Sequence, residues 1–193
     1  MSEGLKNPDA HERSRAVHAL GGSQDHAGAV RALETVLRQD PDRGVRIDAA
    51  LALGQLGGPD ATALLVEKAA STDESYIRTA ALDAIGTSRD PSVVPGLINL
   101  FRLSRGQDDA VAQVGARQAL LKIGAPGVPQ LLQALKDPSP KVRTAVVEVL
   151  GKVGNPEVAD RIAGLQADPD FGVRWEVERA LAELKGKPGP TTP

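Results

Sequence analysis

The chain of 193 residues contains no cysteine and hardly any aromatic side chains, with one Trp, one Tyr and two Phe. The absence of cysteine excludes disulfides, thiolate catalysis and cysteine-ligated metals. No apolar run approaches the length that a membrane-spanning helix needs, and the first residues lack the apolar segment of a signal peptide. These absences predict a cytoplasmic protein with no membrane partner.

The charge is nearly balanced, at −2 formally, and it lacks the basic surplus of a typical nucleic-acid-binding protein. Nucleic-acid grooves also commonly offer aromatic side chains for base stacking, and aromatics make up only 2% of this chain. Both features argue against a nucleic-acid partner. The apolar content, 41% of the residues, is mostly Ala, Leu and Val, which favours closely packed helices.

One pattern, Val-Arg-x-x-Ala-x-x-x-Leu-Gly, recurs along the chain, and it is clearest at residues 45–54. Six copies close at residues 21, 54, 86, 124, 151 and 182. A repeat of this length is typical of a solenoid, in which each unit packs only against its neighbours. Helices that carry the pattern are expected at 10–20, 43–56, 74–86, 110–123, 140–153 and 171–185. Intervening helices are expected at 26–38, 60–70, 91–104, 127–136 and 156–167, giving eleven antiparallel helices.

The longer pattern Asp-Pro-Asp-x-x-Val-Arg-x-x-Ala, clearest at residues 40–49 and 168–177, resembles the short bacterial type of HEAT repeat that is also found in phycobilin lyases. The resemblance implies an all-α fold, a right-handed α-solenoid of antiparallel helix pairs. We expect an N-terminal extension at 1–8, a single solenoid at 9–185 and a disordered C-terminal tail at 186–193.

In that family, the turn aspartate and the helix arginine form a ladder between neighbouring repeats, and the resemblance implies the same role here. The fourth repeat departs from the pattern because Ala116 occupies the arginine position and Arg117 is displaced by one, which predicts an interrupted ladder. The residues assigned to the ladder are Asp9, Arg13, Asp42, Arg46, Arg78, Arg143, Asp170 and Arg174.

The positions ten, seven and three before each closing residue share one helix face, opposite the apolar face, and we call this face the variable stripe. Its residues differ from repeat to repeat, and the resemblance implies that it lines the concave side. The only Tyr and the only Trp both lie on it, although either residue is also suited to covering a neighbouring turn or the last repeat. The predicted partner-binding residues are Ile47, Leu51, Tyr76, Asp83, Arg117, Leu121, Lys141, Glu148, Trp175 and Arg179.

No catalytic residue, metal site or cofactor is predicted. His11, His18 and His26 all lie in the first repeat, where a polar cap is favoured over a two-histidine metal site completed by Glu12 or Asp25.

The sequence therefore predicts a noncatalytic scaffold that binds a protein or peptide on its concave surface. Two alternatives remain open: a phycobilin-lyase-like subunit that holds a chromophore or its acceptor protein, and a HEAT-like nucleic-acid-binding protein. Polar residues at core-type positions of the first and last helices favour a monomer, because they suit terminal caps. These residues are Glu12, Glu178 and Glu183.

Overall fold

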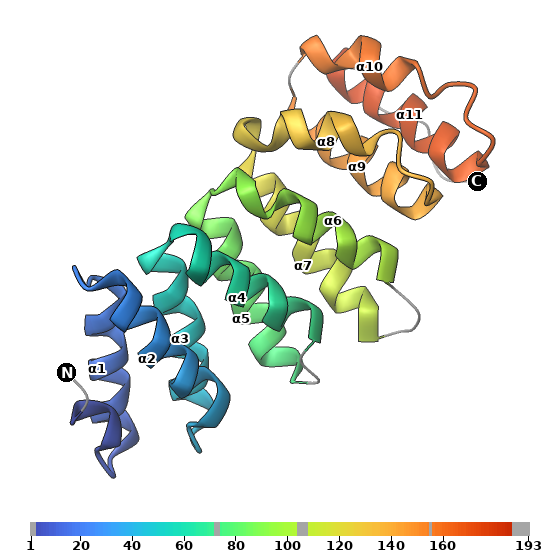
Figure 1. Cartoon of the computed structure of the whole chain (residues 1–193). Helices are drawn as coiled ribbons and strands as arrows, with labels where there is room; N and C mark the ends of the chain where they lie inside the picture. The colour runs from blue at the N-terminus through green and yellow to red at the C-terminus, as the bar shows by residue number, and fades with distance from the viewer. Residues whose placement is uncertain (1–2, 72–73, 104–107, 155, 187–193) are drawn as a thin grey trace. The chain divides into compact units, whose positions relative to one another are not determined.

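The computed structural model describes residues 3–71, 74–103, 108–154 and 156–186, and these residues form helices joined by short turns, with no strand among them (Figure 1). Eleven α-helices and four short 3-10 helices lie within the described residues, which confirms the all-α solenoid. None of these helices has the length and hydropathy required to cross a bilayer. The chain divides into two compact units, residues 1–93 and 94–193, and each is described separately.

In the first unit, the helices that carry the repeat pattern (α1, α3 and α5) pack in sequence, while α2 and α4 pack mainly against α3 and α5 (Figure 1). The short η1 helix packs against α1, so part of the predicted N-terminal extension covers the first repeat. The elements are η1 Gly4–Lys6, α1 Ala10–Gly21, α2 His26–Gln39, α3 Arg43–Leu56, α4 Gly58–Ser71, α5 Ser75–Ser88 and η2 Pro91–Val93.

The second unit repeats this arrangement, with α7, α9 and α11 carrying the pattern and α9 packed against both of the others. Its intervening helices are shorter than the predicted ranges because the prolines near their starts lie in separate 3-10 turns. The elements are α6 Val94–Leu103, α7 Asp108–Ile123, η3 Ala125–Gly127, α8 Val128–Ala134, α9 Pro140–Val153, η4 Pro156–Val158, α10 Ala159–Ala163 and α11 Phe171–Leu184.

Each unit has a core of small aliphatic side chains at recurring positions of the pattern. In the second, third, fifth and sixth repeats, the side chains nine and five residues before the closing residue are almost completely buried. Burial of such side chains, at about 25 cal/mol per Å² of apolar surface, is the main favourable contribution to folding. The residues are Val45, Ala49, Ile77, Ala81, Val142, Val146, Val173 and Val177.

The closing glycines lie where neighbouring helices approach most closely. A Cβ atom on Gly54 would lie 2.7 Å from the Cβ and 3.0 Å from the Cα of Ala84, and one on Gly151 would lie 2.8 Å from the Cβ of Ala180. Real Cβ atoms essentially never come within 3.0 Å of such a neighbour. The repeated Gly therefore permits the contacts between α3 and α5 and between α9 and α11.

Candidate functional site

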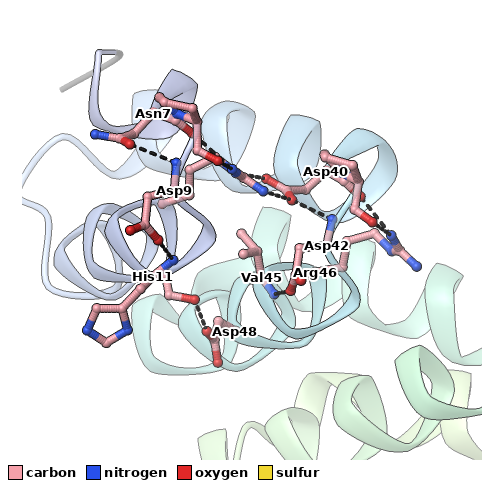
Figure 2. Close-up of polar contacts among 12 residues, drawn as sticks. Asn7, Asp9, His11, Asp40, Asp42, Val45, Arg46 and Asp48 are labelled. Atoms are coloured by element: carbon pink, nitrogen blue, oxygen red, sulfur yellow. Dashed lines mark hydrogen bonds and ion pairs between the residues drawn. The ribbon is translucent and has the colours of Figure 1, made fainter.

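The aspartates that immediately precede the pattern-bearing helices act as helix caps. The carboxylate of Asp9 accepts a hydrogen bond from the backbone N–H of His11 at 2.8 Å, and Asp42 accepts one from Val45 at 3.1 Å (Figure 2). Asp170 caps α11 in the same way, through the N–H of Val173 at 3.1 Å. These side chains satisfy backbone donors that a helix start otherwise leaves unpaired.

The ladder arginine instead binds the first acid of the following Asp-Pro-Asp turn. The Nε and Nη2 atoms of Arg13 donate to Asp40 at 2.8 and 2.9 Å, and both residues are only 8% exposed. Nη1 donates to the carbonyls of Asn7 and Pro8 in the turn before its own helix. Hydrogen bonding by the Arg13 guanidinium lowers the pKa of the Asp40 carboxyl despite the opposing effect of burial. The contact therefore joins two consecutive repeats.

The same arrangement recurs near the other end of the chain. Arg143 donates from Nε and Nη2 to Asp168 at 2.7 and 2.8 Å, and from Nη1 to the carbonyls of Asp137 and Pro138. Its hydrogen bonds lower the pKa of Asp168. Bidentate arginine–carboxylate pairs of this kind are geometrically specific as well as strong.

The junction between α3 and α5 uses a different acceptor. Arg46 again donates from Nη1 to its own turn, at the carbonyls of Asp40 and Pro41, but its Nη2 donates to Glu74 at 2.7 Å and to the Tyr76 hydroxyl at 2.5 Å. The Tyr76 hydroxyl also donates to Glu74.

The Arg43 guanidinium lies 5.1 Å from the centre of the Tyr76 ring, so an arginine interacts with the ring as well as with the hydroxyl. Tyr76, predicted as a partner-binding residue, is thus half-buried within a junction between repeats. Arg78, the ladder arginine of α5, is also half-buried.

The fourth repeat compensates for its missing ladder arginine. Ala116 is fully buried, and Asp137, which corresponds in position to Asp40 and Asp168, receives a hydrogen bond at 2.5 Å from Arg102 of α6. The displaced Arg117 forms an ion pair with Glu148 at 2.8 Å and lies 5.4 Å from the centre of the Phe101 ring. The acidic turn therefore still has a guanidinium partner, and Arg117 is placed on the variable stripe.

In the first unit the variable stripe is mostly polar and internally bonded. The Ser14 hydroxyl donates to Asp48 at 2.5 Å, and His18 Nε2 lies 3.8 Å from the other carboxylate oxygen of Asp48. Ile47 and Leu51 are half-buried. Asp83 is exposed on α5. Among the described residues, no group of three or more His, Cys, Asp or Glu side chains is arranged to hold a metal ion.

In the second unit, the face of α7 that carries the stripe exposes aliphatic side chains. Val114 is 51% exposed, and Val111, one turn earlier on α7, is 48% exposed. Leu121 is half-buried and Lys141 is exposed. An aliphatic ridge therefore lies on α7 beside Arg117.

Charged stripe residues of α9 and α11 form ion pairs with nearby side chains. Glu148 pairs with Arg117 and also accepts a hydrogen bond from Lys152 at 2.7 Å. On α11, Arg179 donates to Glu176 at 2.5 Å and to Glu183 at 3.2 Å.

The Arg179 guanidinium also lies 5.8 Å from the centre of the Trp175 ring, which is half-buried. Burial raises the pKa of Glu176 even though its bond to Arg179 acts in the opposite direction. The stripe residues Trp175 and Arg179 of α11 therefore contact each other, and Arg179 is also bonded to two glutamates of the same helix.

Several residues important to this surface were missed from the sequence. Asp40 and Asp168 supply carboxylates to the ladder. Their spacing is visible in the sequence, because each lies six residues before the arginine that donates to its backbone carbonyl. The exposure of Val111 and the contribution of Arg102 had no comparable signal. Both depend on the departures from the pattern in the fourth repeat.

Comparison with known proteins gives the same architecture. The sequence profile for HEAT repeats matches residues 1–86, 32–118 and 94–182. A HEAT repeat-containing taxis protein from Halobacterium salinarum is 30% identical over 164 residues, which amount to 83% of this chain and 36% of that protein. This chain thus spans little more than a third of its relative.

Two solved structures are similar over most of the chain. The complex of CpcE and CpcF of phycocyanin lyase from Nostoc has a TM-score of 0.52 and 24% identity, and the match covers 94% of this chain and 74% of that one. Human deoxyhypusine hydroxylase has a TM-score of 0.48 and 19% identity, covering 96% and 94% of the two chains. Because the HEAT-repeat profile matches nearly the whole length, this chain belongs to the HEAT-repeat family.

Proposed function

We propose that the protein is a noncatalytic scaffold that binds a protein or peptide through the variable stripe. One observation supports this proposal: the same arginine–aspartate contact joins repeats at both ends of the chain, whereas the side chains on the stripe differ from repeat to repeat. The Arg13–Asp40 and Arg143–Asp168 pairs have nearly the same geometry. The side chains on the stripe, by contrast, range from Asp48-bound Ser14 to exposed Val114. Variation among otherwise identical units is what a recognition surface requires.

The stripe of the second unit is the stronger candidate for the main contact. Val111 and Val114 are each about half exposed, whereas the apolar core residues of the same unit are buried. Interface affinity usually depends on a few apolar or aromatic anchors surrounded by polar groups. Lys141 and the Arg117–Glu148 pair supply such polar groups nearby on α7 and α9. We therefore expect ligands with an aliphatic or aromatic anchor.

A random peptide library selected against the immobilised protein tests this proposal. Peptides that emerge are then titrated against the wild type and a Val111→Ser/Val114→Ser double variant. Because the two valines are exposed, the variant is expected to fold normally while affinity falls about tenfold or more. Circular dichroism checks the helical content of each protein.

The matched control is Ala63→Ser, which alters an exposed apolar position of α4 outside the stripe. Equal affinity of the wild type and the double variant would contradict the proposed surface. A loss in the Ala63→Ser control of similar size would move the binding site to α4.

A phycobilin-lyase-like role is the second candidate, supported by the exposed Lys141 and the half-buried Trp175 on the same stripe. A cation and an aromatic ring suit the carboxylates and the conjugated system of an open-chain tetrapyrrole. In this case, adding phycocyanobilin to the protein would change its visible absorption, and Trp175→Ala would reduce the change. An unchanged spectrum would contradict the lyase-like role and leave the scaffold proposal standing.

A further inference from the structure

The last ladder arginine differs from Arg13 and Arg143, because no acidic side chain among the described residues forms a hydrogen bond with it. Arg174 donates from Nη1 to the carbonyls of Asp168 and Pro169, at 2.6 and 3.0 Å, just as the others bond their own turns. Within the part of the chain that the structure describes, its Nε and Nη2 atoms have no hydrogen-bond partner. These are the two atoms that bind Asp40 in Arg13 and Asp168 in Arg143.

Hydrogen bonds to the turn already position the Arg174 side chain for binding such a carboxylate. Its two bonds to the turn fix one edge of the guanidinium, which reduces the side-chain entropy lost when the other edge binds. The guanidinium lies 5.8 Å from the centre of the Phe171 ring, and this ring is 67% exposed. The first turn of α11 therefore combines a guanidinium edge that has no partner among the described residues with a large exposed apolar side chain.

The C-terminal half of α11 differs from the earlier pattern-bearing helices at positions that pack against a neighbouring repeat. Ala182 stands at the closing position, where Gly54 and Gly151 admit the neighbouring helix. Glu178, four residues before it, is exposed, whereas the corresponding residues of the earlier repeats are apolar and buried: Val17, Ala50, Leu82, Leu120 and Val147. A ligand here must deliver a carboxylate without a closely packed helix.

We propose that Arg174 and Phe171 form a docking site for an aspartate-containing turn of a partner protein. The two occupied copies of the site define the ligand, since in each the carboxylate comes from an aspartate that also accepts the backbone N–H two residues later. The positive guanidinium and the negative turn are complementary, and bidentate pairing sets the orientation. This site is separate from the variable stripe, so its failure would leave the proposed scaffold function untouched.

A second copy of the chain is a poorer ligand. Its first repeat carries Asn7 at the position of Asp40 and Asp168, and the Asn7 side chain accepts from Asp9 N–H as the aspartates accept from theirs. A neutral amide cannot form the charged bidentate pair. The proposal therefore concerns a different protein.

The probe is a synthetic peptide with the sequence of residues 165–172, which contains the turn that Arg143 binds. It is titrated into the full-length, ¹⁵N-labelled protein, and the arginine Nε–H signals are followed by NMR. We expect the Arg174 signal to move with saturation, while the Arg13 and Arg143 signals stay in place because their forks are occupied. A peptide carrying Asp168→Asn is expected to bind at least about tenfold more weakly.

Two protein variants separate the charge from the apolar contact. Arg174→Lys keeps the charge and a donor to the turn but loses the fork, and we expect about a tenfold loss of affinity. Phe171→Ala leaves the arginine unaltered and is expected to weaken binding about threefold. Arg161→Lys, on the exposed face of α10, is the matched control. Glu178→Gln removes a negative charge one turn after Arg174 that would repel the carboxylate of the ligand, and it is expected to tighten binding about twofold.

The proposal is overturned if no saturable binding is seen at about 1 mM peptide, a concentration that detects weak complexes. Equal affinity of the Asp168→Asn peptide, or an unmoved Arg174 signal, would overturn it too. Sedimentation of the protein alone is the remaining arm: self-association that Arg174→Lys abolishes would assign the site to a second copy and contradict a heterologous partner.

Discussion

In both units, arginine side chains join consecutive repeats by binding an acidic turn, but only in the first unit do all of these arginines occupy the pattern position. Arg13 of α1 binds Asp40, and Arg46 of α3 binds Glu74. In the second unit, the pattern arginine is missing from α7, and Arg102 of α6 binds Asp137 in its place. The guanidinium that binds an acidic turn can therefore come from either a pattern-bearing helix or an intervening helix.

The substitution in the fourth repeat also alters the surface. Because the arginine is displaced by one residue, Arg117 leaves the ladder and pairs with Glu148 on the variable stripe. The same side of α7 also carries two exposed valines, Val114 on the stripe and Val111 one turn before it. A departure from the pattern has therefore changed a stacking residue into a surface residue, which is one way for a repeat array to acquire a binding face.

The largest expected effect tests whether the two kinds of junction are equally important. Asp40→Ala should destabilise the first unit by roughly 3 kcal/mol, because it leaves the buried Arg13 guanidinium without its counter-ion. Asp137→Ala should cost about 1 kcal/mol, since the side chain of Arg102 is 46% exposed and can turn to water. Urea unfolding of each variant measures both values.

Each aspartate also accepts a backbone N–H two residues later, so that loss is common to both variants and cancels in the comparison. Equal destabilisation would mean that Arg102 replaces the pattern arginine fully. A smaller effect for Asp40→Ala than for Asp137→Ala would contradict the contrast between the units.

The next effect concerns a feature that the units share. Gly54→Ala and Gly151→Ala should each destabilise the protein by about 1–2 kcal/mol, because the added Cβ meets Ala84 or Ala180 and this overpacking exceeds the gain in helix propensity. Gly22→Ala is the control, since its Cβ would have no neighbour within 4 Å. Clearly unequal costs at the two closing glycines would show that the junctions differ in packing as well as in charge.

The eleven helices were expected from the sequence, because they follow from a local pattern. The intervening helices of the second unit were expected to be longer than they are. For example, the helix predicted at 156–167 is a 3-10 turn followed by α10, Ala159–Ala163. Proline and glycine weaken these helices, and propensity alone does not fix where a weak helix ends.

The side-chain partners were harder to predict. The sequence places an aspartate four residues before Arg13, Arg46 and Arg174, and helical neighbours at that spacing usually interact. In the structure, those aspartates accept backbone N–H groups at the helix starts. Arg13 binds Asp40 and Arg46 binds Glu74, both from the next repeat. Which acid binds a given arginine depends on the distance between repeats, and a local sequence pattern does not determine that distance.

A third effect contrasts two carboxylates of the second unit by pH. The native pKa of Asp168 lies below its unfolded value of about 3.9, so its stabilising contribution is complete above that pH and is lost as the pH falls through the native pKa. The free-energy difference between wild type and Asp168→Asn should therefore shrink in acid. Unfolding curves at a series of pH values from 7 to 3 measure this change.

Glu176 should behave in the opposite way, because burial raises its native pKa above the unfolded value of about 4.3. Its contribution is complete below that value and is lost as the pH rises through the native pKa. The Glu176→Gln variant should therefore gain stability relative to the wild type between acid and neutral pH. Parallel pH dependences of the two variants would contradict the different environments of the two carboxylates.

The smallest expected effect concerns Tyr76, which exists only in the first unit. Tyr76→Phe removes the hydroxyl that bonds Arg46 and Glu74 but keeps the ring beside Arg43, and Arg46 keeps its ion pair with Glu74. The cost should be about 0.5–1 kcal/mol, the usual net value of a hydrogen bond, measured by urea unfolding. A loss of several kcal/mol would mean that the tyrosine, and not Glu74, is the true counterpart of Asp40 at this junction.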